Sequence, residues 1–247
     1  MAEQDLMLVT GGSRGIGAAI VQLAGNGHRV AFFYRSNRTE AEACVRAAAS
    51  RGVTATMIQA DVGDEASLLR GFEAADKLGR IRVLVNNAGV TGGRSRLEAV
   101  SAQQLNEVLR VNVAGAFLAA REAVKRMSTR HGGAGGSIVN ISSGASKSGS
   151  PNSWIHYAAT KGAMDTMTLG LAREVAAEGI RVNAIRPGVI ATDIQNDRTP
   201  EQLEAMIKMI PQGRMGRPDE IARTVLWLIS EEASYVTGGL FDVAGGL

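Results

Sequence analysis

The sequence predicts an α/β protein in which a parallel β-sheet is covered by helices on both faces. Short runs with β-sheet character alternate with segments long enough to form helices, which is typical of βαβ units. Several of the short runs are almost entirely apolar, as a strand covered on both faces requires. The 247 residues, 45% of them hydrophobic, are sufficient to bury a full globular core.

The expected strands follow one another along the whole chain. The first spans residues 6–10, a helix follows Gly15, and the second strand spans residues 29–34. Further strands are expected at residues 55–59, 83–86, 137–142, 181–186 and 240–243. No repeat, linker or change of composition interrupts this order. We therefore expect one domain over residues 1–247, with a lid segment at about residues 190–215.

Two of the expected helices carry recognisable start signals. Ser101 and Gln104 form the pattern of a capping box in front of a helical apolar stripe. Pro218 precedes two acidic residues and a second stripe that begins at Ile221. The glycine-rich residues 132–136 are too few to separate domains, so we expect a turn from a helix to a strand there.

Composition excludes several classes of protein. The net charge of +3 is spread along the chain, so we expect no nucleic-acid partner. Cys44 is the single cysteine, which excludes an internal disulfide and fits a reducing compartment. His28, His131 and His156 lack metal-ligand spacing, so no metal is expected. The sequence shows neither a secretory signal nor a membrane-length apolar stretch, and we expect a cytoplasmic protein without membrane contact.

A glycine-rich segment, TGGSRGIG at residues 10–17, lies between the first strand and the first helix. Gly11, Gly15 and Gly17 would let the backbone turn sharply and approach a pyrophosphate at the positive end of the helix. The spacing differs from G-x-G-x-x-G, and an ordinary tight turn is the alternative. The position between a strand and a helix favours a cofactor site.

Tyr157 and Lys161 are four residues apart, so a helix would place them on one face. A tyrosine with a pKa near 10 is a poor base at neutral pH, and lowering that pKa by about three units needs roughly 4 kcal/mol. A lysine ammonium together with a cationic nicotinamide ring could supply it in a water-poor cleft. The alternative for this pair alone is a surface lysine beside a half-buried tyrosine.

The order and spacing of the motifs resemble the short-chain dehydrogenase/reductase family over essentially the whole chain. The motifs are TGGSRGIG, NNAG at residues 86–89, Ser143, the Tyr157–Lys161 pair and Pro187-Gly188. The glycine pattern is similar to the short reductase branch, which includes 3-oxoacyl-carrier-protein reductases and glucose dehydrogenases. This resemblance implies one doubly wound Rossmann-type domain with a seven-stranded parallel sheet and a nicotinamide dinucleotide across the carboxyl ends of the strands.

The resemblance implies four catalytic residues. Tyr157 would be the acid/base, and Lys161 would lower the pKa of Tyr157 and hold the nicotinamide ribose. Ser143 would hydrogen-bond the substrate oxygen, with Ser142 as the alternative because the spacing to Tyr157 is longer by one residue than in many relatives. Asn112 would support a water and proton path to the lysine, or would simply be a polar residue near a helix bend.

The resemblance also implies a set of cofactor-binding residues. Asp61-Val62 would contact the adenine edge, although an aspartate at a strand end is often a turn former. Asn86 is expected to tie adjacent strands together instead. The residues expected to bind the cofactor are Gly11, Ser13, Arg14, Gly15, Ile16, Gly17, Arg35, Asp61, Val62, Asn87, Ala88, Gly89, Tyr157, Lys161, Pro187, Gly188, Ile190 and Thr192.

The end of the second strand favours NADP over NAD. A site selective for NAD needs an acidic group on the ribose 2′-hydroxyl, and Tyr34 occupies the expected place. Arg35, with Arg14 and Ser13, could instead bind a 2′-phosphate. Use of both NADP and NAD is the alternative.

The substrate is expected to be a small carbonyl compound or alcohol. Residues 194–210 resemble the mobile lid of the family, although a packed surface helix is the alternative, and residues 91–96 and 144–156 would complete the substrate site. A 3-oxoacyl thioester and a sugar are both admissible. Two alternatives are a non-catalytic NADP-sensing regulator, which would have no reason to keep the catalytic set, and a nucleotide-sugar epimerase, whose longer substrate domain we do not expect after Leu247.

A homotetramer is expected from two helical regions. Residues 105–127 and 158–175 carry apolar side chains on more than one face, and a monomer would leave part of that surface in contact with water. The residues concerned include Phe117, Leu118, Met164, Met167 and Leu171. The alternative is that both helices are buried within one subunit.

Overall fold

The computed structural model describes residues 5–25, 29–196 and 198–247, and its centre is one parallel β-sheet. The seven strands lie in the order β3-β2-β1-β4-β5-β6-β7. They are β1 (Asp5–Val9), β2 (Arg29–Tyr34), β3 (Ala55–Gln59), β4 (Arg80–Asn86), β5 (Gly136–Ile141), β6 (Ile180–Pro187) and β7 (Leu240–Val243). Each predicted strand is present, and the ends of β2, β3 and β7 are as predicted.

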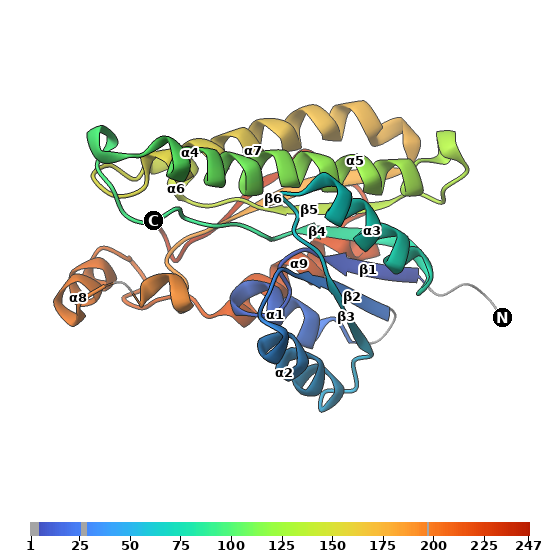
Figure 1. Ribbon diagram of the computed structural model, residues 1–247, viewed down its shortest axis with the longest axis horizontal. Coiled ribbons are helices and arrows are strands. Elements are labelled where there is room, and N and C mark those ends of the chain that lie inside the picture. The colour runs from blue at the N-terminus through green and yellow to red at the C-terminus, as the bar shows by residue number, and fades with distance from the viewer. Residues whose placement is uncertain (1–4, 26–28, 197) are drawn as a thin grey trace.

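Helices cover both faces of the sheet (Figure 1). The helices α3, α4, α5 and α7 lie above the sheet in this view, and α1, α2 and α9 lie below it. The helices are α1 (Gly15–Leu23), α2 (Arg38–Ala49), α3 (Glu65–Asp76), α4 (Ala102–Leu109), α5 (Gly115–Met127), α6 (Ala145–Ser148), α7 (Ile155–Val175), α8 (Pro200–Lys208) and α9 (Pro218–Ile229). The result is the predicted three-layer, single-domain α/β architecture.

The central strand β1 is apolar at successive positions because both faces of the sheet are covered there. Met7 and Val9 pack into a core cluster with α1, α2 and α9, whereas Leu6 and Leu8 pack into a second cluster with α3, α5 and α7. Successive side chains of a strand point to opposite faces, so both sets must be apolar when both faces are covered. All four side chains are fully buried.

Buried hydrogen bonds hold α7 against β5. The Asn140 amide donates to the Thr168 hydroxyl at 2.9 Å, and the Ser142 hydroxyl donates to the Lys161 carbonyl at 3.2 Å. The Lys161 ammonium donates to the Ile141 carbonyl at 2.7 Å. Because buried polar groups are costly when unpaired, these contacts specify how α7 sits on the sheet.

The predicted helix starts are present. Ser101 and Gln104 form the capping box at the start of α4, and Pro218 occupies the first turn of α9. The turn at residues 132–136 begins with Gly132 in the left-handed region, at φ 82°. The helix that starts after Ser101 is less regular than expected, because a five-residue π-helical turn (Arg110–Ala114) separates α4 from α5.

Neither a membrane-spanning helix nor a metal-ligand cluster is found in the described parts of the chain. No helix there is both long and apolar enough to cross a bilayer. No group of three or more metal-ligating side chains occurs within the same residues. His28, one of the three histidines considered above, lies outside the described residues.

Candidate active site

A cavity of about 1170 Å³ opens at the carboxyl ends of the strands. Loops that follow β1 to β6 line it, including the sheet position where the strand order reverses, between β1 and β4. Open α/β sheets bind ligands at such a position. Of the predicted site residues, all except Gly17 and Asn112 line this cavity.

The glycine-rich loop is shaped to approach a phosphate group. Gly15 has φ +55°, and a Cβ at Gly17 would collide with the Gly11 carbonyl. Gly17 therefore lies beneath the loop rather than on the cavity wall. Arg14 precedes α1 and makes no side-chain capping bond to the first turn. The N–H groups of this turn and the positive end of the helix suit the diphosphate of a dinucleotide.

The NNAG segment organises this loop from the neighbouring strand. The Asn87 amide donates to the carbonyls of Thr10 and Gly11 at 3.0 and 2.8 Å. The Thr10 hydroxyl accepts from the backbone of Asn87 and of Ala88 at 3.0 Å each. Sequence reasoning missed this role of Thr10, although its place at the strand end was visible. Asn86 donates to the Asn140 side chain at 3.1 Å, which confirms that it ties two strands together.

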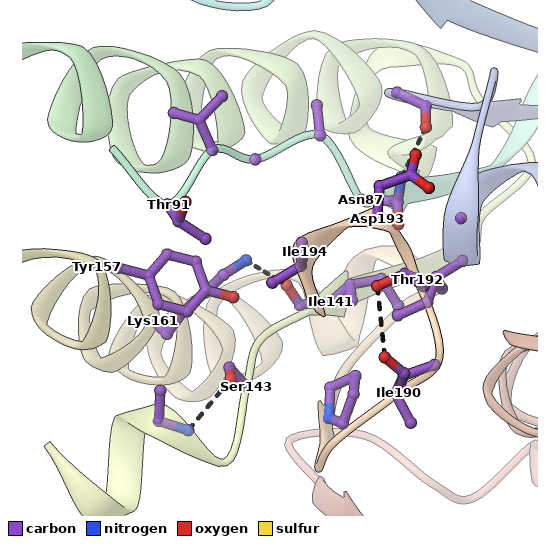
Figure 2. Close-up of a pocket in the computed structure, with 18 of the residues that line it drawn as sticks. Asn87, Thr91, Ile141, Ser143, Tyr157, Lys161, Ile190, Thr192, Asp193 and Ile194 are labelled. Carbon is purple, nitrogen blue, oxygen red and sulfur yellow. Dashed lines mark hydrogen bonds between the residues drawn. The ribbon is translucent and has the colours of Figure 1, made fainter. Parts of the chain in front are cut away.

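Tyr157, Lys161 and Ser143 surround one part of the cavity (Figure 2). Tyr157 and Lys161 project from the same side of α7, with the Lys161 Nζ 5.6 Å from the centre of the phenol ring. The Ser143 Oγ accepts from the Ala145 N–H at 3.1 Å and can still donate its own proton. The Ser142 hydroxyl is buried against the Lys161 carbonyl, so Ser143 is the better placed of the two serines.

Burial changes the pKa values of the catalytic pair in opposite directions. It raises the pKa of Tyr157 to about 12, against an opposing effect of the Ser143 hydroxyl. It lowers the pKa of Lys161 to about 8, against an opposing effect of the Asp165 carboxylate. Both shifts disfavour the charged form, as desolvation requires. In the chain alone desolvation dominates the pKa of Tyr157, so the lowering expected from Lys161 together with a cationic nicotinamide ring stays a prediction.

Asn112 lies in the π-helical turn and is fully buried. Its side chain accepts from the Val90 N–H and donates to the Val90 carbonyl, both at 2.8 Å, and donates to the Thr160 hydroxyl at 3.0 Å. These bonds join the loop after β4 to α7. Asn112 reaches the cavity only through these neighbours, so its role in a proton path stays a prediction.

The arginines expected at the cofactor ribose are paired with acids. Arg35 contacts Glu107 at 3.3 Å, and Arg14 lies 3.8 Å from Asp193 in the lid segment. Asp61 accepts from Arg110 at 3.2 Å. Both Arg35 and Arg14 are exposed, so a stronger anion could displace these acids at little cost.

Asp61 also acts as the turn former that was considered as its alternative. Its side chain accepts from the Gly63 N–H at 2.9 Å while the residue still lines the cavity. Glu107 and Arg110 were not predicted as part of this region. Their three-residue spacing on a helix was visible, but nothing in the sequence placed them beside Arg35 and Asp61.

The lid segment contains a short 3-10 turn (Asp193–Gln195) and α8. Figure 2 shows Ile194 and Thr192 among the residues that line the cavity, and Thr192 lies against Gly15 of the glycine-rich loop. Trp154 and Arg198 also line the cavity and were not singled out from the sequence.

Known proteins are similar to this chain in sequence and in architecture. A family model described as enoyl-(acyl carrier protein) reductase matches residues 11–247. The uncharacterized oxidoreductase YgfF of Escherichia coli is 46% identical over 244 residues, which is 98% of this chain and 99% of that protein. A short-chain dehydrogenase/reductase from Serratia marcescens superposes with a TM-score of 0.90 at 34% identity, covering 99% of this chain and 98% of that one. This chain belongs to the short-chain dehydrogenase/reductase family.

Two further relatives bear on the chemistry of this short-chain dehydrogenase/reductase. The 3-oxoacyl-[acyl-carrier-protein] reductase FabG of Staphylococcus aureus is 38% identical over 242 residues, 97% of this chain and 96% of that protein. A blue fluorescent protein from a metagenomic library, solved in complex with NADPH, has a TM-score of 0.89 and 35% identity over 99% of this chain and 98% of that one. The chain is an NAD(P)-dependent oxidoreductase.

The buried ammonium of Lys161 should make stability depend on pH. Folding lowers its pKa from 10.5 to about 8, which costs about 3 kcal/mol below pH 8. Between these values the unfolded chain holds more protons, so this cost shrinks as pH rises. The free-energy advantage of Lys161→Met over the wild type should therefore fall by about 2 kcal/mol from pH 7 to pH 10, measured by urea unfolding.

The exposed Lys77→Met is the matched control and should show no such change with pH. If Lys161→Met keeps the same difference from the wild type at both pH values, then the ammonium is not desolvated in the folded protein.

Proposed function

We propose that this chain is an NADPH-dependent reductase or dehydrogenase of a small carbonyl compound or alcohol, with Tyr157 as its acid/base. The placement of Tyr157, Lys161 and Ser143 in the same cavity as the glycine-rich loop is the observation that carries the proposal. A non-catalytic sensor of NADP is the alternative. Cofactor oxidation on a panel of aldehydes, ketones and 3-oxoacyl thioesters, run with NADPH and with NADH, separates the two.

The proposed mechanism moves one proton and one hydride. A nicotinamide cofactor held at the glycine-rich loop and the Tyr157–Lys161 pair would supply a hydride for reduction and accept one in oxidation. Tyr157 gives its phenolic proton to the substrate oxygen in reduction, and its high pKa keeps that proton in place at neutral pH. Ser143 donates a hydrogen bond to the same oxygen, which stabilises the negative charge that develops there.

Lys161 supports the ionised form of Tyr157 after the proton has left. Its pKa of about 8 keeps the ammonium largely charged at pH 7, and the charge is not cancelled by a direct carboxylate partner, because its hydrogen bond goes to the Ile141 carbonyl. In oxidation, Tyr157 must be ionised before it can accept a proton, and positive charge from Lys161 and from a bound oxidised nicotinamide would favour that phenolate.

The preference for NADPH rests on Arg35 and Arg14. Both arginines line the cavity together with Ser13. At the end of β2, Tyr34 stands where an NAD-selective site would carry an acidic residue. Charge-assisted bonds to a 2′-phosphate are stronger than the exposed ion pair that Arg35 makes now. Glu107 competes with the phosphate for Arg35 and so limits the preference.

The proposed assembly is a homotetramer of cytoplasmic subunits. Exposed apolar side chains on α4, α5 and α7 support it, with Leu109 and Phe117 42% and 49% exposed. Met164 and Met167, also expected at a contact, are instead buried with Ala116 between α5 and α7. These two methionines are therefore buried within one subunit and do not contribute to the expected contact surface. The lone buried Cys44 is compatible with a reducing compartment.

Replacing the phenol should stop proton transfer. Tyr157→Phe should lower kcat by about 10² to 10⁴, because a general acid is lost, while the Kd for NADPH should change far less. The measurements are NADPH oxidation with the best substrate of the panel and NADPH titration by fluorescence. Tyr235→Phe, at a fully exposed tyrosine, is the control and should match the wild type. Near-full turnover of Tyr157→Phe would remove this residue from the mechanism.

The cofactor proposal predicts that kcat/KM is at least about tenfold higher with NADPH than with NADH. Tyr34→Asp combined with Arg35→Ala should reverse this order, because an acid then meets the ribose 2′-hydroxyl. Glu107→Gln should increase the NADPH preference by freeing Arg35. Arg46→Ala, at an exposed arginine in the last turn of α2, is the control. A wild type that prefers NADH would contradict the proposal.

The assembly proposal predicts a light-scattering mass of four times the 25.9 kDa subunit. Dilution should reduce activity and thermal stability together, because the site adjoins α4, α5 and α7. Phe117→Glu should lower the mass, whereas Leu97→Glu, at an apolar side chain that is more exposed but lies off these helices, should not. A monomer mass at all concentrations with full activity would refute the tetramer.

A further inference from the structure

Three segments that are distant in the sequence meet at the ring of Trp154. Trp154 directly precedes α7, Arg94 belongs to the loop after β4, and Arg198 lies between the 3-10 turn of the lid segment and α8. The guanidinium carbon of Arg94 is 4.7 Å from the centre of the indole, and that of Arg198 is 5.5 Å from it. One aromatic side chain therefore holds two arginines close together.

This cluster adjoins the catalytic tyrosine. The rings of Trp154 and Tyr157 meet edge to face, with their centres 6.4 Å apart. Trp154 is 8% exposed, and both Trp154 and Arg198 line the cavity that contains Tyr157. Arg94 does not line the cavity, but its guanidinium contacts the Trp154 ring, which does. A substrate with its reacting carbonyl at Tyr157 could thus extend to the Arg198 guanidinium.

The positive charges of this cluster lack acidic partners among the described residues. The Nε and Nη2 atoms of Arg94 are buried without a hydrogen-bond acceptor. The Nε of Arg198 donates to the neutral amide of Gln195 at 2.9 Å. Burial lowers the pKa of Arg198, and the nearby charge of Arg94 lowers it further. By contrast, Arg96, two residues away from Arg94, forms an ion pair with Glu98 at 2.6 Å.

Two partly buried guanidinium groups with like charge are unfavourable unless an anion compensates them. The indole lowers this cost through cation–π contact but supplies no negative charge. A planar carboxylate matches the fork of N–H donors on a guanidinium, and charge-assisted bonds of this kind are roughly twice as strong as neutral hydrogen bonds. A neutral substrate would bring no such charge to the two guanidinium groups, which have no acidic partner in the described parts of the chain.

We propose that the substrate is an oxo carboxylic acid, or the corresponding hydroxy acid, whose carboxylate binds Arg198 beside Trp154 while Arg94 strengthens the positive potential there. This inference rests on the proposed function, since it assumes that a carbonyl reacts at Tyr157. It assigns Arg198 to substrate selection and makes Arg94 a positioning residue that acts through the Trp154 ring.

Matched acid and ester substrates test the proposal. NADPH oxidation is measured with methyl ketones that carry a carboxylate, from 3-oxobutanoate to 6-oxoheptanoate, and with the methyl ester of each. At one chain length kcat/KM should be at least about tenfold higher for the acid than for its ester, as a charge-assisted bond predicts. A series is used because the distance from the reacting carbonyl to the Arg198 guanidinium determines how many carbons must separate the ketone from the carboxylate.

Variants locate the effect. Arg198→Gln should reduce the acid-to-ester ratio at least about tenfold, and Arg198→Lys, which keeps the charge without the fork, should retain part of it. Arg94→Gln should reduce the ratio less. Arg130→Gln, at an exposed arginine that is paired with Glu178 and lies outside the cavity lining, should leave the ratio unchanged. An unchanged ratio in Arg198→Gln would overturn the assignment.

Two other outcomes would also be decisive. If the esters or a neutral 3-oxoacyl thioester are reduced as well as or better than every acid, the anion inference is wrong while the proposed oxidoreductase function stands. If no carbonyl compound of either kind oxidises NADPH, the proposed function itself fails, and this inference fails with it.

Discussion

The attachment of α7 to the carboxyl end of β5 is the constraint on which the site depends. Asn140, Ile141 and Ser142 are successive residues at this end of the strand, and each is hydrogen-bonded to α7. Tyr157 and Lys161 lie on that helix, so their positions relative to the strand ends follow from these contacts. Because all of these polar groups are buried, a shift of α7 would leave several of them unpaired at about 1–3 kcal/mol each.

Burial that orients the catalytic pair also sets its electrostatics. Tyr157 and Lys161 are both driven towards their neutral forms, since the cavity wall replaces water around them. The chain therefore holds a protonated phenol beside an ammonium that can lose its proton near pH 8. Charge brought in by the cofactor or by the reaction acts in a medium with little screening, so it changes the proton affinity of Tyr157 more than it would in water.

The two ends of the cavity treat positive charge differently. At the expected ribose end, Arg14 and Arg35 are exposed to water and paired with acids. An anionic ligand could therefore replace these acids at little cost. At the Trp154 end, Arg198 is partly buried and rests against an aromatic ring. Exposed ion pairs contribute little to stability, whereas uncompensated buried charge is costly. The arginines at the Trp154 end therefore constrain the charge of the ligand more strongly than the exposed arginines at the ribose end do.

The sequence by itself determined the sheet, the helix starts and the chemical residues, because these depend on local pattern. Apolar runs located the strands, Ser101 and Pro218 located helix starts, and the glycines and Tyr157–Lys161 located the chemistry. Tertiary structure alone decided that Gly17 lies beneath the loop, that Asn112 lies in a π-helical turn and that Trp154 gathers two arginines from separate segments. Burial and contacts between distant segments set these features, and neither has a local signal in the order of residues.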